Sequence, residues 1–170
     1  MQIEHIATRT ALVLETNNLR GGADSTLATQ SLKRLIKILD EQTLPLQQLA
    51  QVVITHDGLP AQDCLEIAEL AGYPIEFVQI QNNAGYYDAK NIGFDKTDAS
   101  RCRYVVFGDS DCVPAKDWLE QLLIPFITEQ APAVVVGRTS YKATLTGTAL
   151  TTIDFMYFPN RLGANTTSNF

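Results

Sequence analysis

The segment Tyr104-Val105-Val106-Phe107-Gly108-Asp109-Ser110-Asp111 decides the fold, because an apolar run stops abruptly at a glycine and two acids. β-Branched and aromatic residues in such a run are typical of a buried strand. In an extended chain, residues i and i+2 point to the same side, so Asp109 and Asp111 are expected to present their carboxylates to one space. Two carboxylates at such a short distance repel each other unless a cation lies beside them. Their hard oxygens suit Mg²⁺ or Mn²⁺. The structural alternative is that Asp109 merely ends the strand and Asp111 begins a helix at Pro114.

Similar apolar runs alternate with segments of helical periodicity along the rest of the chain. Strands are expected at residues 10–14, 52–54, 75–80, 104–107 and 133–136. Helices are expected over residues 32–39, 61–71 and 86–97, and again from Pro114 until Pro125 ends or kinks the last one. In the helix over 61–71, Leu65 and Ala68 are expected to face inward. This alternation predicts an α/β fold with a Rossmann-like, mainly parallel sheet and helices on both faces.

Composition and charge limit the classes of protein to which the chain can belong. The 170 residues are 45% hydrophobic and 19% charged, which predicts one folded domain. A formal net charge of −6 argues against a nucleic-acid binder, since that role needs a basic surface. Three cysteines without a CxxC pair predict reduced thiols, and no apolar run reaches the length of a transmembrane segment. We therefore expect a cytoplasmic protein that is either soluble or peripheral to a membrane.

Polar residues follow the expected strands, at the edge where ligands bind in parallel sheets. These polar segments are Glu15-Thr16-Asn17-Asn18, Thr55-His56-Asp57-Gly58, Gln81-Asn82-Asn83-Ala84-Gly85 and Gly108-Asp109-Ser110-Asp111. In this setting Asp57 can accept a hydrogen bond from a nucleobase N–H, although Asp-Gly is also frequent in ordinary strand-to-loop turns. Lys90 would normally be a solvated helix charge. Asn91 and Gly93 beside it are poor helix formers, which indicates that packing or a ligand requires them.

Taken together and in this order, the motifs resemble those of the GT-A fold of family 2 glycosyltransferases. The family's second-strand ending is matched by His56-Asp57-Gly58, and its DxD motif is matched by Asp109-Ser110-Asp111. The family's N-x-G…A-R-N-x-G segment is matched by Asn83-Ala84-Gly85 and Ala89-Lys90-Asn91-Ile92-Gly93, and its later V-G-G strand by Val136-Gly137-Arg138. The resemblance covers most of the chain and implies a single GT-A domain over residues 1–170 that binds a nucleotide sugar.

The same resemblance implies how a donor such as a UDP-sugar would bind. Asp57 would accept a hydrogen bond from the base, in a pocket lined by the end of the first strand at Glu15, Thr16 and Asn17. Lys90 stands in the place of the family's arginine and would lie beside the base or the ribose.

Metal binding and sugar transfer are also implied by the resemblance. Asp109 would bind the ribose or the metal, and Asp111 would ligate the Mg²⁺ or Mn²⁺ that bridges the diphosphate. The cation would stabilise the departing diphosphate as charge develops. A hydroxyl of a glycan or lipid-linked acceptor, deprotonated by a general base, would attack the anomeric carbon with inversion.

The chain departs from the family pattern at three places. Glu15-Thr16-Asn17 replaces the usual Pro-x-Tyr/Phe-Asn, and His56 replaces the first of two acids. The chain ends at Thr167-Ser168-Asn169-Phe170, inside the acceptor segment, so we expect a truncated C-terminus and the catalytic base beyond residue 170. Asp154 has no neighbouring Glu-Asp pair and is not assigned as that base, so the catalytic residues are unknown. Apolar residues over 153–158 fit a core segment, and they favour homo-oligomers if their packing partners are missing.

Two other functions are compatible with this type of sheet. The first is a non-catalytic module that binds nucleotide sugars, which the missing base region favours. The second is a nucleotidyltransferase, for which Leu19-Arg20-Gly21-Gly22 gives a faint glycine-rich loop without the expected downstream lysines. A dinucleotide-binding dehydrogenase is disfavoured because GxGxxG is absent.

Overall fold

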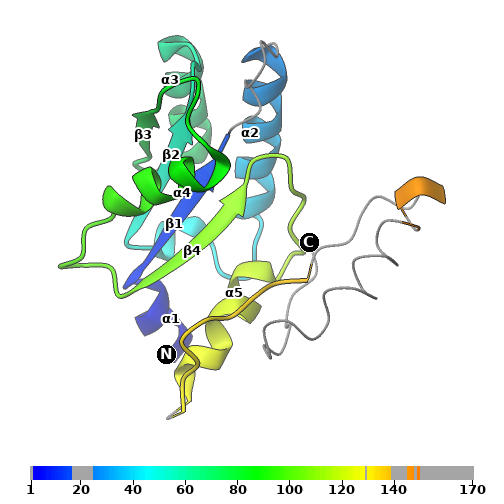
Figure 1. Cartoon of the computed structure of the whole chain (residues 1–170). Helices are drawn as coiled ribbons and strands as arrows, with labels where there is room; N and C mark the ends of the chain where they lie inside the picture. The colour runs from blue at the N-terminus through cyan, green and yellow to red at the C-terminus, as the bar shows by residue number, and fades with distance from the viewer. Residues whose placement is uncertain (1, 17–24, 129, 139–144, 148, 150–170) are drawn as a thin grey trace.

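The computed structural model describes residues 2–16, 25–128, 130–138, 145–147 and 149. Within them, four parallel strands form one sheet in the order β3-β2-β1-β4 (Figure 1). The strands are β1 Thr10–Glu15, β2 Gln51–His56, β3 Glu76–Gln79 and β4 Tyr104–Asp109. The helices are α1 Gln2–Ala7, α2 Ser25–Asp40, α3 Ala61–Ala71, α4 Tyr86–Asp95 and α5 Trp118–Leu123, with 3₁₀ turns η2 Leu46–Gln48 and η3 Ile124–Ile127.

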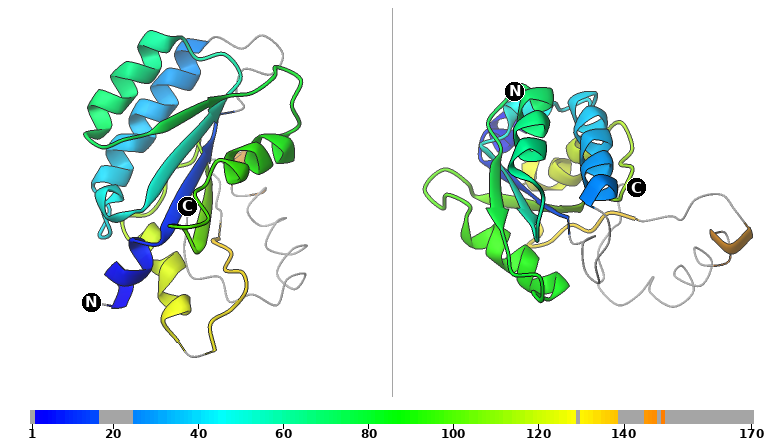
Figure 2. Two further views of the ribbon diagram at one scale, coloured as in Figure 1. Left: turned by 90° about the vertical axis from the view of Figure 1, so that its left-hand side faces the viewer. Right: turned by 90° about the horizontal axis from the view of Figure 1, so that it is seen from above.

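The predicted α/β fold with helices on both faces of the sheet is confirmed. Figure 2 shows the α2–α3 pair on one face and α4 on the other. Leu12 and Leu14 of β1 join the larger core on the α2–α3 side, which also includes Trp118. Val13, between those two leucines, belongs to a smaller apolar cluster with Val53, Val78, Ile92 and Val105. The alternation of side chains along β1 therefore supplies both layers of the core.

The absence of a side chain at Gly93 lets helix α4 pack directly against the sheet. A Cβ at this position would stand 2.5 Å from Val13 Cγ1 and 3.1 Å from Thr55 Cγ2. One turn earlier in α4, Ala89 is completely buried on the same helix face. The expectation that packing requires a poor helix former at Gly93 is thus confirmed, whereas Asn91 is exposed.

Helix α3 has the predicted bounds, but it is rotated relative to the expectation. Its buried residues are Ile67 and Ala71, whereas Leu65 is 59% exposed and Ala68 is half-buried. Polar contacts with α2 set this rotation: Thr29 Oγ1 donates to Asp63 Oδ2 at 2.6 Å, and Lys33 pairs with Glu66 at 2.6 Å. These contacts point the 63 and 66 positions towards α2 and bring Ile67 into the core.

The segment after β4 also differs from the expectation. Pro114 is buried but lies outside any helix, and α5 begins only at Trp118. Gln42 determines this start from a distance, because its Oε1 accepts the Leu119 N–H at 3.2 Å and its Nε2 donates to the Ala115 carbonyl at 2.7 Å. Pro125 accompanies the change from α-helix to 3₁₀ turn at Ile124, as predicted.

The apolar run over 133–136 is not a strand, and Val135 within it packs on the large core without joining the sheet. Helix α1 was not expected. Cys64, Cys102 and Cys112 are free, as predicted. Over the ranges that the structure describes, no helix has both the length and the apolar character required to cross a bilayer.

Candidate functional site

The candidate site lies at the carboxyl ends of β1, β2 and β4. Glu15 and Asp109, the last residues of β1 and β4, are partners in the parallel register, and Glu15 also pairs with Thr55 of β2. Ser110 N donates to the Glu15 carbonyl at 3.0 Å, which extends the β1–β4 connection past the strand end. The parallel order of the strands therefore collects acids that are far apart in the sequence.

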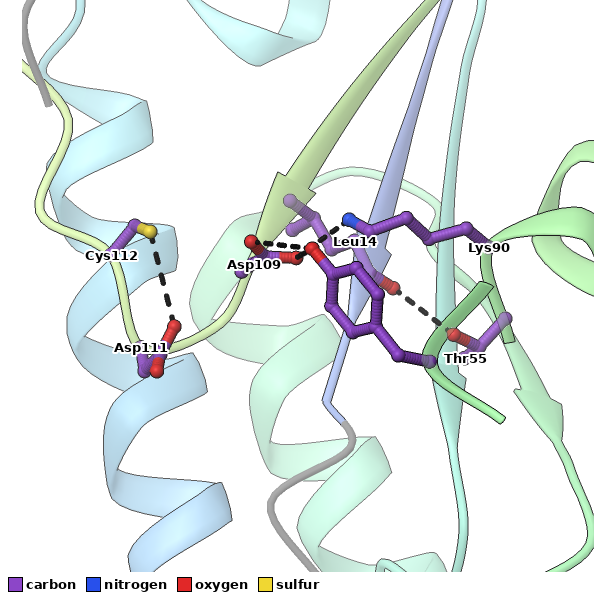
Figure 3. Close-up of polar contacts among 7 residues, drawn as sticks. Leu14, Thr55, Lys90, Asp109, Asp111 and Cys112 are labelled. Carbon is purple, nitrogen blue, oxygen red and sulfur yellow. Dashed lines mark hydrogen bonds and ion pairs between the residues drawn. The ribbon is translucent and has the colours of Figure 1, made fainter. Parts of the chain in front are cut away.

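Asp109 is the centre of a polar cluster with two residues of α4. Lys90 Nζ lies 2.6 Å from Asp109 Oδ1 (Figure 3). The Tyr86 hydroxyl lies 3.0 Å from both carboxylate oxygens of Asp109, to which it donates. A single carboxylate thus receives a charged donor and a neutral donor from the same helix.

Helix α4 places both donors because Tyr86 and Lys90 are four residues apart, on one helix face. Gly85 is the N-cap that precedes the helix, and its N–H donates to Asp88 Oδ2 at 3.0 Å. A carboxylate in the first turn satisfies a backbone N–H that has no partner within the helix and interacts favourably with the helix dipole. Asp88 therefore stabilises the turn that carries Tyr86.

Two aromatic rings enclose the ammonium group of Lys90. Lys90 Nζ lies 4.8 Å from the centre of the Tyr86 ring and 5.9 Å from that of Phe107. Phe107 is two residues before Asp109 in β4, so both side chains project from the same face of the sheet. Burial raises the pKa of Tyr86 above its ordinary value, and the negative charge of Asp109 raises it further. The Tyr86 hydroxyl therefore remains protonated at neutral pH and can donate to Asp109.

Asp57 follows β2 and offers a buried acceptor. It is 5% exposed, and its Oδ1 is buried with no hydrogen-bond partner among the described residues. Such an oxygen is costly to leave unpaired, so it favours a ligand that donates a hydrogen bond. Its neighbour His56 is turned to the other face of β2, where its ring meets Phe77 edge-on and its Nδ1 accepts the Leu59 N–H at 3.1 Å.

Asp111 does not continue the strand, so the expected extended spacing from Asp109 is wrong. Strand β4 ends at Asp109, and Cys112 N donates to the Asp109 carbonyl at 3.2 Å to close a turn. Figure 3 shows Asp111 apart from the Asp109 cluster, near Cys112. Its Oδ1 accepts a weak hydrogen bond from Cys112 Sγ at 3.9 Å, and its backbone carbonyl accepts a hydrogen bond from Arg34 Nη2 at 3.2 Å. Burial raises the pKa of Cys112 to about 11, so this thiol is protonated at neutral pH.

The end of β1 contributes to the site unevenly. Glu15 is 4% exposed, and its charge acts on Tyr86, which places it within electrostatic reach of the Asp109 cluster. Thr16 is completely buried, and its hydroxyl donates to the Thr55 carbonyl at 2.7 Å, so this side chain joins β1 to β2. Asn17, which the sequence placed in the base pocket, lies outside the described residues.

Two residues that contact the site, Tyr86 and Arg34, were not anticipated from the sequence. Tyr86 could have been found from its i, i+4 spacing to Lys90 within the expected helix over 86–97. Arg34 lies in α2 and reaches the turn at Asp111 through a contact that no local pattern reveals. The arrangement as a whole offers carboxylate acceptors to hydroxyl and N–H groups, with one lysine to balance their charge.

Comparisons with known proteins agree with this architecture. The family model described as glycosyl transferase family 2 matches residues 27–169. Among solved structures, S. aureus TarS 1–349 is similar with a TM-score of 0.57 and 20% sequence identity. The alignment covers 79% of this chain but 36% of that one, so this chain spans about a third of the TarS structure. No curated protein matches the chain. At this identity, TarS supports the fold, whereas the family model covers most of the sequence.

Proposed function

Because this chain belongs to glycosyl transferase family 2, we propose that the carboxyl edge of its sheet binds the nucleoside diphosphate of a sugar donor. The proposed donor is a UDP-sugar. The observation that carries the proposal is the buried Asp57 Oδ1, which has no protein partner within the described part of the chain. The imide N–H of uracil is a donor of the kind that this oxygen requires.

The remaining parts of the nucleotide are assigned from the positions of the other acids. Asp109 lies at the end of β4, beside Glu15 of β1, and would accept hydrogen bonds from the ribose hydroxyls. Lys90 reduces the negative charge at that point, since its ammonium group lies 2.6 Å from Asp109 Oδ1. Glu15 would line the pocket between the base and the ribose, with Thr16 holding the strand ends together.

A divalent cation fits Asp111 better than Asp109. Mg²⁺ and Mn²⁺ commonly bind one or two carboxylates together with phosphate oxygens. Asp111 is exposed, and the contact of its side chain with the described residues is the weak thiol donor of Cys112, whereas Asp109 already accepts bonds from Lys90 and Tyr86. Over the described residues, no three or more His, Cys, Asp or Glu side chains gather to hold a metal, so the diphosphate would supply further ligands. When bound, the cation would neutralise charge on the leaving diphosphate.

The reaction that we propose is transfer of the sugar to a hydroxyl of a glycan or lipid-linked acceptor. Holding the nucleotide at the base, the ribose and the diphosphate leaves the anomeric carbon open on the side away from the diphosphate. Attack from that side inverts the configuration. No described residue is assigned as the base that deprotonates the acceptor.

The test is calorimetric titration of the chain with UDP and CDP in the presence of Mg²⁺ or Mn²⁺. UDP is expected to bind more tightly than CDP, because cytosine has no N3–H to donate to Asp57. Replacing Asp57 by alanine should weaken UDP binding by about tenfold or more, as expected for loss of a hydrogen bond to a charged group. The same variant should bind CDP about as well as the wild-type chain does.

Asp95→Ala is a matched control, because Asp95 is an exposed acid at the other end of α4. This variant should bind UDP as tightly as the wild-type chain. Equal affinity for UDP and CDP in the wild-type chain, or unchanged UDP binding in Asp57→Ala, would contradict the assignment of Asp57 to the base.

A further inference from the structure

We propose that Tyr86 is a positioning residue that, together with Lys90, holds the Asp109 carboxylate in one orientation for the donor's ribose. The inference rests on the proposed function for the identity of the ligand. The contacts themselves are independent of any ligand, since they join described side chains of β4 and α4.

Lys90 alone cannot fix the direction in which the Asp109 carboxylate points. An ammonium group is a compact charge that can follow a rotating carboxylate, unlike the planar fork of an arginine. Its close contact is to one oxygen, Oδ1, at 2.6 Å. Rotation of Asp109 about its Cα–Cβ bond would therefore remain possible with Lys90 as the partner, because the flexible lysine can follow Oδ1.

The Tyr86 hydroxyl removes this freedom because it lies 3.0 Å from each of the two oxygens. A donor at equal distances from both oxygens lies in the plane that bisects the O–Cγ–O angle, so turning Asp109 about its Cα–Cβ bond would lengthen at least one of these contacts. Lys90, which contacts Oδ1, is the partner that distinguishes the two oxygens. A carboxylate accepts about four hydrogen bonds, so lone pairs remain for two ribose hydroxyls. Tyr86 thus orients Asp109 without occupying all of its acceptor positions.

The Tyr86 ring has a second effect, which the hydroxyl does not share. Its face and that of Phe107 enclose Lys90 Nζ, so the ring helps to keep the ammonium group beside Asp109. Replacing Tyr86 by phenylalanine keeps this ring and removes the hydroxyl, so the substitution isolates the bond to Asp109.

The experiment compares UDP affinity by calorimetry, with Mg²⁺ present, in Tyr86→Phe, Lys90→Arg and the double variant Tyr86→Phe/Lys90→Arg. Tyr86→Phe should weaken binding by about tenfold. Arginine can bond both carboxylate oxygens at once. Lys90→Arg in the Tyr86→Phe background should therefore restore affinity to within about threefold of the wild-type chain.

Tyr87→Phe is the matched control. Tyr87 is the next residue in α4, is 77% exposed, and meets the Tyr86 ring edge-on at 5.2 Å between centroids. Its hydroxyl makes no hydrogen bond to a described side chain, so Tyr87→Phe should bind UDP as the wild-type chain does.

Two results would overturn the proposal. The first is wild-type affinity in Tyr86→Phe. The second is a double variant as weak as Tyr86→Phe, because a general structural loss would not be rescued by arginine. A double-mutant cycle of Tyr86→Phe and Asp109→Asn, measured by urea unfolding, tests the contact without any nucleotide. If the wild-type chain binds no nucleotide, the proposed function fails, and additivity in this cycle would show that Tyr86 does not hold Asp109 either.

Discussion

Burial of His56 gives the chain a specific response to acid. Burial lowers the pKa of His56 below its ordinary 6.5, and the opposing effect of the Asp57 charge is smaller. The unfolded chain therefore takes up this proton at a higher pH than the folded chain does. Well above pH 6.5 the titration of His56 does not change the stability of the chain. As the pH falls below 6.5, the free energy of unfolding decreases until the pH reaches the pKa that His56 has in the folded chain.

We therefore expect His56→Asn to reduce the loss of stability between about pH 7.5 and pH 5, as measured by urea unfolding. The asparagine Oδ1 can accept the Leu59 N–H in place of His56 Nδ1, so the variant should still fold. The only other histidine, His5, is exposed, and His5→Gln is the control. If the two variants lose stability equally on acidification, His56 does not carry this effect.

Single residues of the site were predictable to different degrees. Asp57, Lys90 and Asp109 stand out in the sequence because they follow strands or belong to recognisable motifs, and the structure places them at one edge of the sheet. The position of Asp111 was predicted from an extended chain, but a turn begins directly after Asp109. The turn could not be predicted because it depends on contacts with β1 and Arg34, which are remote in the sequence.

At the scale of the element, the contact of α4 with the sheet depends on Gly93. Gly93→Ala should lower the free energy of unfolding by about 1–3 kcal/mol, because its Cβ would stand 2.5 Å from Val13 Cγ1. The intrinsic helix propensity of alanine acts in the opposite direction, by up to about 1 kcal/mol. Urea unfolding of the variant and the wild-type chain measures the net effect.

Asn91→Ala in the same helix is the matched control, because Asn91 is exposed and alanine is the better helix former. This substitution should be neutral or stabilise the chain by a few tenths of a kcal/mol. A Gly93→Ala variant as stable as the wild-type chain would mean that the cost of moving α4 away from the sheet is no larger than the gain in helix propensity.

The elements themselves were predictable where local pattern decides them. The apolar runs of β1, β2 and β4 need no information from elsewhere in the chain, and Gly72 at +68° in φ ends α3 as its sequence position predicts. The start of α5 was not predictable, since Gln42 satisfies its first backbone groups from the other half of the chain. The run over 133–136 has the composition of a strand, but it does not join the sheet, and Val135 packs on the core instead.

At the scale of the whole molecule, charge makes the proposed donor site unfavourable for a diphosphate without a cation. The chain carries a net charge of −6. Glu15, Asp57 and Asp109 lie at the carboxyl ends of their strands, Asp111 follows in the turn after β4, and Lys90 pairs with Asp109. Two unit charges about 4 Å apart interact by roughly 1 kcal/mol even in water, so a few such pairs change affinity by about tenfold or more. Repulsion of this kind acts on the diphosphate and not on the uncharged nucleoside.

Removing divalent cations with a chelator should therefore weaken UDP binding by about tenfold or more and leave uridine binding nearly unchanged. Asp111→Asn should bind UDP more weakly than the wild-type chain when Mg²⁺ is present and should lose most of the response to the chelator. Added salt screens repulsion, so it should improve the affinity for UDP measured without divalent cations. If uridine and UDP respond equally to the chelator, or if Asp111→Asn responds as the wild-type chain does, the cation does not act on the diphosphate through Asp111.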